Sequence, residues 1–188
     1  MRATRKPAAR PRRYVALLRG INLGARNRVP MAGLRDLCEQ AGATDVRTYI
    51  GSGNVVFTSP LSAKAIRRKL ERAIEKEFRI SVFVVILTAG QLAAVIKRNP
   101  LTGAQPNTLD VAFATSPIAK PDIDRLAKLD IRDIAVRGRL IYMRMPNGYG
   151  RSGLAAEVSR VKVPTTVRNW RTIGVLNELA ADTDTISP

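Results

Sequence analysis

The apolar and polar positions in the first half of the chain follow a regular series of strand and helix patterns. The clearest helix is Leu61–Phe78, where apolar residues recur every three or four positions and charged residues occupy the opposite face. An earlier helix is predicted from Pro30, with Gly42 as its terminating glycine. Short apolar or β-branched runs predict strands at Tyr14–Ile21, Val46–Ile50, Asn54–Thr58 and Ser81–Leu87. The resulting order, β-α-β-β-α-β, is that of a ferredoxin-like unit.

The second half of the chain repeats most of this order. A connecting helix is predicted to end near Arg98, and the stretch Asn99–Asn107, which contains two prolines, is the predicted boundary between two lobes. A strand, a helix, a hairpin and two further helices are expected, in turn, at Leu109–Thr115, Pro121–Leu129, Ile131–Arg144, Ser152–Arg160 and Thr165–Ala181. The predicted fold class is therefore α+β with two packed lobes. Residues 14–98 form the ferredoxin-like lobe, and residues 99–188 form a related β-α-β-β-α unit with an extra C-terminal helix.

The run Ser81–Leu87 indicates how the lobes are arranged. It is apolar at nearly every position, as strands covered on both faces usually are. We therefore expect the second lobe, or the terminal helix, to cover the face of the first sheet that its own helices leave open.

The charge is strongly positive and unevenly distributed. The chain has 188 residues with a formal net charge of +17, from 32 lysines and arginines against 15 acidic residues. The segment Met1–Arg13 has six basic residues and no acidic one, and is predicted to be a disordered arm. The stretch Arg137–Arg171 has eight basic residues against Glu157 alone. Such a charge attracts polyanions, nucleic acid among them, although the arm is equally consistent with a solvated leader that has no role.

The composition excludes several kinds of chemistry. The chain has no histidine, so Ser-His-Asp and Cys-His nucleophile systems and His-ligated metal sites are excluded. The single cysteine, Cys38, lies on the apolar stripe of a predicted helix and is interpreted as a buried structural residue. One cysteine allows neither an internal disulfide nor a thiolate cluster, and this suits a reducing, cytoplasmic environment. No apolar run is long enough to cross a membrane, and we expect no metal and no cofactor.

Two loops and a group of aromatic residues are candidates for binding. The stretch Arg19–Pro30 combines glycines, asparagines and arginines before a helix N-terminus, a composition typical of anion binding, or it is a long connection with solvated arginines. The stretch Gly51–Asn54 could offer a hydroxyl and backbone N–H groups to a ligand, or it is an ordinary hairpin turn. Tyr142, Tyr149 and Trp170 lie among cations, where they could stack on bases or serve as core anchors.

Three ordered stretches carry a family resemblance: Tyr14–Gly24 with Asn27 and Val29–Met31, then Val46–Phe57, then Pro164–Thr172. They resemble the bacterial family catalogued as domain of unknown function 1697, which usually has another residue where Gly51 stands. The resemblance implies a two-lobed α+β fold with ferredoxin-like character and no particular activity, because the family is uncharacterised. Its motif positions are mostly polar residues in loops or at helix starts, where functional residues often lie: Arg19, Asn22, Asn27, Ser52, Asn54, Tyr149, Ser152, Arg168, Asn169 and Trp170.

Two functional hypotheses follow, with a structural or protein-interaction role as a third. The leading one is a non-enzymatic module that binds nucleic acid or another polyanion. The alternative is a protein, or an enzyme, that binds a small anionic, phosphorylated ligand. In that alternative Arg19 and Arg168 neutralise the anion, Asn22 and Asn169 orient it, and Trp170 shields it from water.

The remaining motif residues are assigned by their expected position. Asn27 belongs to the same predicted site because it lies in the loop after the first strand. The hairpin turn is expected at the opposite end of the first sheet, so Ser52 and Asn54 are secondary candidates. Tyr149 and Ser152, in the predicted loop and helix start of the second lobe, are secondary candidates as well.

Overall fold

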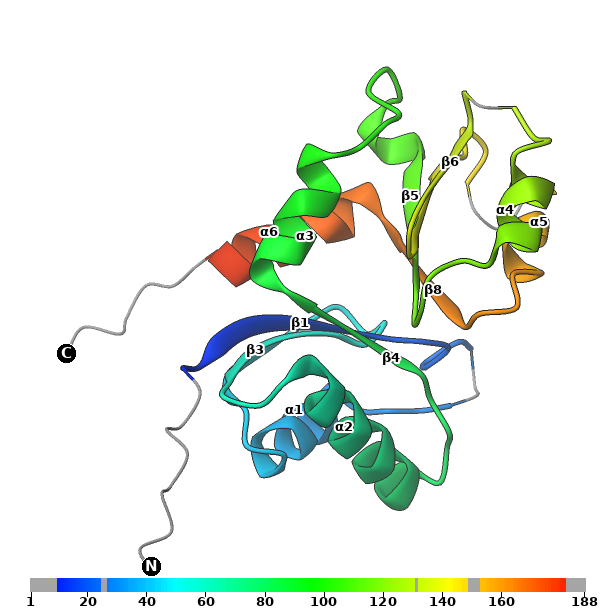
Figure 1. Cartoon of the computed structure of the whole chain (residues 1–188). Helices are drawn as coiled ribbons and strands as arrows, with labels where there is room; N and C mark the ends of the chain where they lie inside the picture. Colours follow the sequence, from blue (N-terminus) through cyan, green and yellow to red (C-terminus); the bar gives the residue numbers. More distant parts are fainter. Residues whose placement is uncertain (1–9, 25–26, 131, 149–152, 182–188) are drawn as a thin grey trace, which may run out of the picture.

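The computed structural model describes residues 10–24, 27–130, 132–148 and 153–181. The first lobe is an antiparallel four-stranded sheet with two helices on one face (Figure 1). Its elements are β1 (Arg12–Leu18), α1 (Met31–Gln40), β2 (Thr44–Tyr49), β3 (Asn54–Ser59), α2 (Ala63–Phe78) and β4 (Val84–Thr88). The strand order is β2-β3-β1-β4, so the predicted ferredoxin-like arrangement is confirmed.

Local sequence signals explain these elements well. Helix α2 begins after Ser62, whose hydroxyl accepts a hydrogen bond from the Ala65 N–H, and it ends at Arg79, which has a left-handed backbone conformation. Its inward positions are fully apolar, with Ile66, Leu70 and Ile74 buried against the sheet.

The remaining elements are the connecting helix α3 and those of the second lobe, which repeats the topology of the first. They are α3 (Ala89–Lys97), a short 3₁₀ turn (Pro106–Thr108), β5 (Leu109–Ala114), α4 (Lys120–Leu126), β6 (Ile134–Arg137), β7 (Leu140–Arg144), α5 (Gly153–Ser159), β8 (Thr165–Asn169) and α6 (Trp170–Ala181). The sheet order is β6-β7-β5-β8. The two-lobed α+β prediction is therefore confirmed, with the extra C-terminal helix in place as α6.

Strand β8 corrects one part of the prediction. Residues 165–169 were assigned to the start of the last helix, with a threonine as its cap, but they pair with β5 as a fourth strand. The helix begins later, at Trp170, because the Asn169 side chain accepts a hydrogen bond of 2.8 Å from the Thr172 N–H and caps its first turn. Each lobe thus has the complete β-α-β-β-α-β order.

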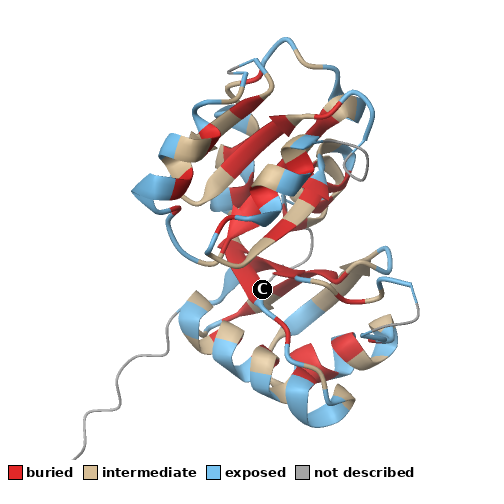
Figure 2. Cartoon of the chain, turned by 90° about the vertical axis from the view of Figure 1, so that its right-hand side faces the viewer, coloured by how far each residue is buried: buried red, intermediate tan, exposed pale blue. Residues whose placement is uncertain are grey.

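The space between the two sheets is filled by α3 and α6, which lie together above the first sheet in Figure 1. Val15 and Leu17 of β1 share one buried cluster with Phe113 and Tyr142 of the second sheet and with residues of both helices. The Tyr142 hydroxyl donates a hydrogen bond of 3.0 Å to the Val95 carbonyl. Buried residues accordingly follow the strands of both lobes in Figure 2. In this arrangement α3 and α6 lie on the face of the first sheet that its own helices leave open.

The N-terminal boundary of the first lobe differs from the prediction. Strand β1 begins at Arg12, so Arg12 and Arg13, assigned to the disordered arm, instead pair with β3. Arg13 forms an ion pair with Asp45 and donates a hydrogen bond to the Leu179 carbonyl of α6. Residues 1–9 of the predicted arm lie outside the described residues. Within the described residues, no helix is long and apolar enough to span a membrane.

Candidate functional site

The three motif blocks meet at Arg168, which joins the two lobes. Arg168 lies on β8, at the edge of the second sheet, and is 8% exposed. Each of its five N–H groups has an acceptor. The hydrogen bonds run from Nε to Asn54 Oδ1, from Nη1 to Thr166 Oγ1 and the Val167 carbonyl (both 2.8 Å), and from Nη2 to the carbonyls of Leu18 (2.8 Å) and Ser52 (2.9 Å). Three of these acceptors belong to the first lobe, so the side chain is a clamp between the lobes.

The clamp holds a buried positive charge whose hydrogen-bond acceptors among the described residues are all carbonyl, hydroxyl or amide oxygens. Burial lowers the pKa of Arg168 from 12.5 to about 10, so the side chain still carries its charge at neutral pH. Carbonyl and side-chain amide oxygens surround the guanidinium group, and no N–H group is left to bind a ligand. The ligand-binding role predicted for Arg168 therefore lacks a free donor in this structure.

The β2–β3 turn is built to receive this guanidinium. Asn54 is fully buried; its Nδ2 donates to the Tyr49 carbonyl (3.1 Å) and to Ser52 Oγ (2.9 Å), which aims its Oδ1 at Arg168. Gly53 has a φ of +75°, and a Cβ placed on it would lie 2.7 Å from both Leu18 Cβ and Ile21 Cδ1. A glycine is required there because the turn packs directly on the end of β1.

The loop between β1 and α1 is closed by its own asparagines. Asn22 and Asn27 have left-handed backbones, with φ of 54° and 51°. The Asn22 amide accepts from the Val29 N–H (2.8 Å) and donates to the carbonyls of Val29 (2.9 Å) and Gly51 (2.7 Å). Asn27 donates to the Gly20 carbonyl (2.9 Å). Both amides thus fix the loop, and Asn22 also binds it to the hairpin turn through the Gly51 carbonyl.

This contact overturns the expectation that loop and hairpin lie at opposite ends of the sheet. Strands β1 and β3 are antiparallel, and Leu17 pairs with Asn54. The start of β3 therefore lies beside the end of β1, which places Ser52 and Asn54 next to Asn22.

The structure does not bring the other predicted ligand residues into one pocket. Arg19 is exposed, whereas Arg168 is buried. Asn169 caps α6, and Trp170 is partly buried against the core between the sheets. Tyr149 and Ser152 lie outside the described residues. Ligand binding by this set stays a prediction. Four of its members form hydrogen bonds within the protein that stabilise the fold: Asn22, Asn27, Arg168 and Asn169.

A basic groove between the lobes was not predicted. Two adjoining cavities of about 320 and 190 Å³ share Val85 and Arg139 and lie between β4 of the first sheet and β5 and β7 of the second. We call them the β4 groove. Four cations line it, Lys64 and Arg67 from α2 and Arg137 and Arg139 from the β6–β7 hairpin, and no carboxylate is among the residues that line either cavity. Its apolar lining includes Val85, Leu87, Val95, Phe113 and Leu140. The sequence did not predict this group, because α2 and the β6–β7 hairpin are far apart in the chain and their cations come together only when the lobes dock.

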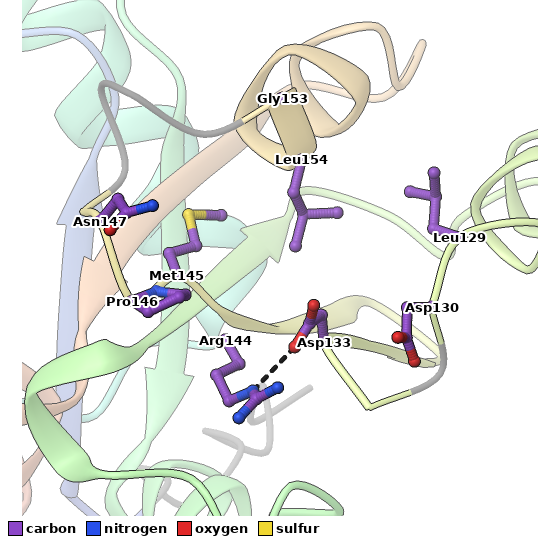
Figure 3. A pocket seen from close by; sticks show the side chains of 9 residues that line it. All are labelled: Leu129, Asp130, Asp133, Arg144, Met145, Pro146, Asn147, Gly153 and Leu154. Carbon is purple, nitrogen blue, oxygen red and sulfur yellow. Dashed lines mark hydrogen bonds and ion pairs between the residues drawn. The ribbon is translucent and has the colours of Figure 1, made fainter.

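The cavity in Figure 3 has a different character. It lies at the end of β7, has a volume of about 370 Å³, and contains two carboxylates, Asp130 and Asp133. Asp133 accepts a hydrogen bond of 2.7 Å from Arg144, and hydrogen bonds from Arg132 lower the pKa of Asp130 to about 2. Both carboxylates are therefore held by arginines.

Cys38, the single cysteine, is buried on α1. Burial, with a smaller contribution from Glu39, raises the pKa of the Cys38 thiol to about 12, so it stays protonated and inert. The described residues contain no group of three potential metal ligands.

The architecture defines a class of small α+β proteins with two ferredoxin-like lobes that share a buried core and are joined by the Arg168 clamp. The chain belongs to the family described as protein of unknown function DUF1697, which matches residues 12–142. It is similar in structure to a conserved bacterial protein, SP0830, from Streptococcus pneumoniae, with a TM-score of 0.73 and 24% sequence identity over 90% of this chain and 99% of that one. No curated protein matches the sequence.

Proposed function

We propose that the protein is a non-enzymatic module that binds single-stranded nucleic acid along the β4 groove. The observation that carries the proposal is the lining of that groove, which combines cations from α2 and from the β6–β7 hairpin with apolar residues and has no carboxylate among the residues that line it. Single-stranded nucleic acid needs this combination, because its phosphates require cations while its bases require apolar or aromatic surface.

The surroundings of the groove supply an aromatic platform. Val82, Val84 and Ile86 all point to the helix-covered face of the first sheet, whereas Val85 points to the second lobe. Phe83 directly precedes β4, and its carbonyl accepts a hydrogen bond of 2.9 Å from the Arg19 N–H. The strand alternation therefore places the Phe83 side chain on the side of Val85, and it is 47% exposed. An exposed phenylalanine beside Arg19 can stack on a base while the arginine contacts a phosphate.

The size of the groove supports a second candidate. Its two cavities together are comparable to ordinary small-ligand sites of a few hundred Å³. A nucleotide-sized phosphorylated ligand would use the same cations. Competition experiments separate the two candidates.

The test measures the affinity of a fluorescently labelled single-stranded 20-mer at several salt concentrations, by fluorescence anisotropy. Arg139→Ala removes a cation of the groove and should weaken binding and lower the slope of log K against log salt by roughly 0.7. Phe83→Ala should cost about 1–3 kcal/mol of binding free energy and leave the salt slope unchanged.

The matched control is Arg132→Ala, which changes the net charge equally at an exposed arginine paired with Asp130. It should behave like the wild type. Equal losses for Arg139→Ala and Arg132→Ala would show non-specific charge attraction and refute the groove. Displacement of the oligonucleotide by a mononucleotide at equal concentration would favour the small-ligand candidate.

A further inference from the structure

A second surface, on the far side of β1 from β4, carries features that folding does not explain. An open depression of about 530 Å³ lies between the β1–α1 loop and the β2–β3 turn. We call it the turn depression. Ile21, Leu23, Val29 and Met31 supply much of its lining. Its asparagine, Asn22, has both amide atoms engaged in the hydrogen bonds that close the loop. The depression therefore offers mainly apolar contact, with Arg28 and Ser52 as the other polar side chains among its lining residues.

Exposed hydrophobic side chains border this depression. Leu23 is 69% exposed and lines it, and Ile50, which is 54% exposed, directly precedes the lining residue Gly51. Together with Phe83, these are the large hydrophobic residues that stand out as exposed in the described part of the chain. Leu23 thus lines the hollow, and Ile50 belongs to the turn that forms one side of it, so exposed apolar residues gather in the two segments around the depression.

Ile50 is also strained. Its φ of 48° is in the left-handed region, which a β-branched side chain adopts at a steric cost. Asparagine or glycine would fit the same turn without that cost. A residue that is both strained and exposed does not stabilise the fold, and such positions cluster at functional sites.

The charge around the depression indicates its partner. Arg28 lines it and is exposed, and no carboxylate is among its lining residues. A second copy of the chain is disfavoured, because two molecules of net charge +17 would bring their arginines together. A phosphate backbone is disfavoured as well, since the apolar lining offers it few donors. We propose that the turn depression binds an acidic peptide segment, which inserts one large apolar side chain between Leu23 and Ile50 and places a carboxylate against Arg28.

The proposal is tested with a displayed library of random 12-residue peptides selected on the purified protein. The enriched peptides should share a large apolar residue flanked by Asp or Glu. Synthetic versions, measured by fluorescence anisotropy, should bind Ile50→Asn and Leu23→Ser at least tenfold more weakly than the wild type. Asparagine accommodates the left-handed turn, so the Ile50→Asn protein should remain folded with an equal or higher melting temperature.

The matched control is Phe83→Ala, which removes the third exposed hydrophobic residue on the β4 side of β1 and should leave peptide affinity unchanged. Arg139→Ala should also leave it unchanged, which separates this site from the β4 groove. Enriched peptides without an acidic-apolar pattern, or with equal affinity for the wild type and Ile50→Asn, would overturn the proposal. Anionic vesicles bound in an Ile50-dependent manner, or a dimer lost in Leu23→Ser, would overturn it in favour of a membrane or a second copy.

Discussion

Replacing Arg168 with methionine tests whether this residue is the clamp between the lobes. The change keeps an unbranched side chain of similar length but removes five N–H donors that reach acceptors in both lobes. Hydrogen bonds from a charged donor contribute at least about 1.5 kcal/mol each, or roughly 7 kcal/mol for the set. The fall in pKa to about 10 shows that burial of the charge opposes this gain, by about 3 kcal/mol. We therefore expect Arg168→Met to lower the free energy of unfolding by about 4 kcal/mol.

The assay is urea unfolding followed by the fluorescence of Trp170, the single tryptophan, which begins α6 and packs against the core between the sheets. For a chain of this size, the loss corresponds to a fall in melting temperature of about 8–16 °C. Arg171→Met is the matched control, because Arg171 is an exposed neighbour, and its effect should stay within about 0.5 kcal/mol. A loss below about 1 kcal/mol for Arg168→Met would refute the clamp.

The remaining predictions concern the first lobe and one carboxylate of the second. Gly53→Ala should destabilise by about 2–3 kcal/mol because its Cβ would lie 2.7 Å from its neighbours at positive φ, whereas Gly51→Ala, with no atom within 4 Å, should be nearly neutral in the same denaturation assay. Ile50→Asn should raise the free energy of unfolding by about 1 kcal/mol, because asparagine adopts the left-handed backbone at this position more easily. An unchanged or lower value would show that the backbone at Ile50 is not strained. Burial raises the pKa of Asp122, but hydrogen bonds from Arg125 and a backbone N–H outweigh it and hold that pKa below 3.8. The ionised Asp122 carboxylate therefore contributes its full stabilisation above about pH 3.8, and this contribution is lost as the pH falls further. In Asp122→Asn, the free energy of unfolding should consequently fall less steeply on the acid side of its pH profile.

Most of the fold follows from local patterns, and β8 shows where they fail. The amphipathic period of α2 and the apolar alternation of β1 and β4 are visible in the sequence because these elements bury apolar faces. Strand β8 buries Thr166 and Arg168 instead. A strand whose inward residues are polar resembles a helix start with a threonine cap. Its strand character comes from pairing with β5 and from hydrogen bonds to the first lobe, which no local pattern records.

The role of the motif residues depends on contacts that are distant in sequence. Arg168 binds Asn54, 114 positions earlier, and the Leu18 carbonyl, 150 positions earlier. The family resemblance indicated Arg168 and Asn169, and anion binding was predicted for them because the same groups that bind carbonyl oxygens also bind an anion. The position of the hairpin turn, in contrast, was available from the predicted topology. In a β-α-β-β-α-β sheet, the turn between the second and third strands lies at the end where the first strand finishes.

The clamp and the β4 groove both lie at the interface between the lobes. One experiment can therefore decide whether Arg168 is a structural clamp or a ligand-binding residue. The clamp lies on the β3 side of β1, whereas the groove lies on the β4 side, so Arg168 does not line the groove. If Arg168 bound the ligand, Arg168→Met would lose oligonucleotide affinity while keeping its melting temperature. If it is the clamp, the variant loses stability, but its affinity measured at 10 °C, where it is still folded, stays within about threefold of the wild type. In the same measurement Arg139→Ala should show the opposite behaviour, with normal stability and weakened binding. If Arg168→Met lost affinity at an unchanged melting temperature, the anion-binding site would have to include Arg168, where the two lobes meet.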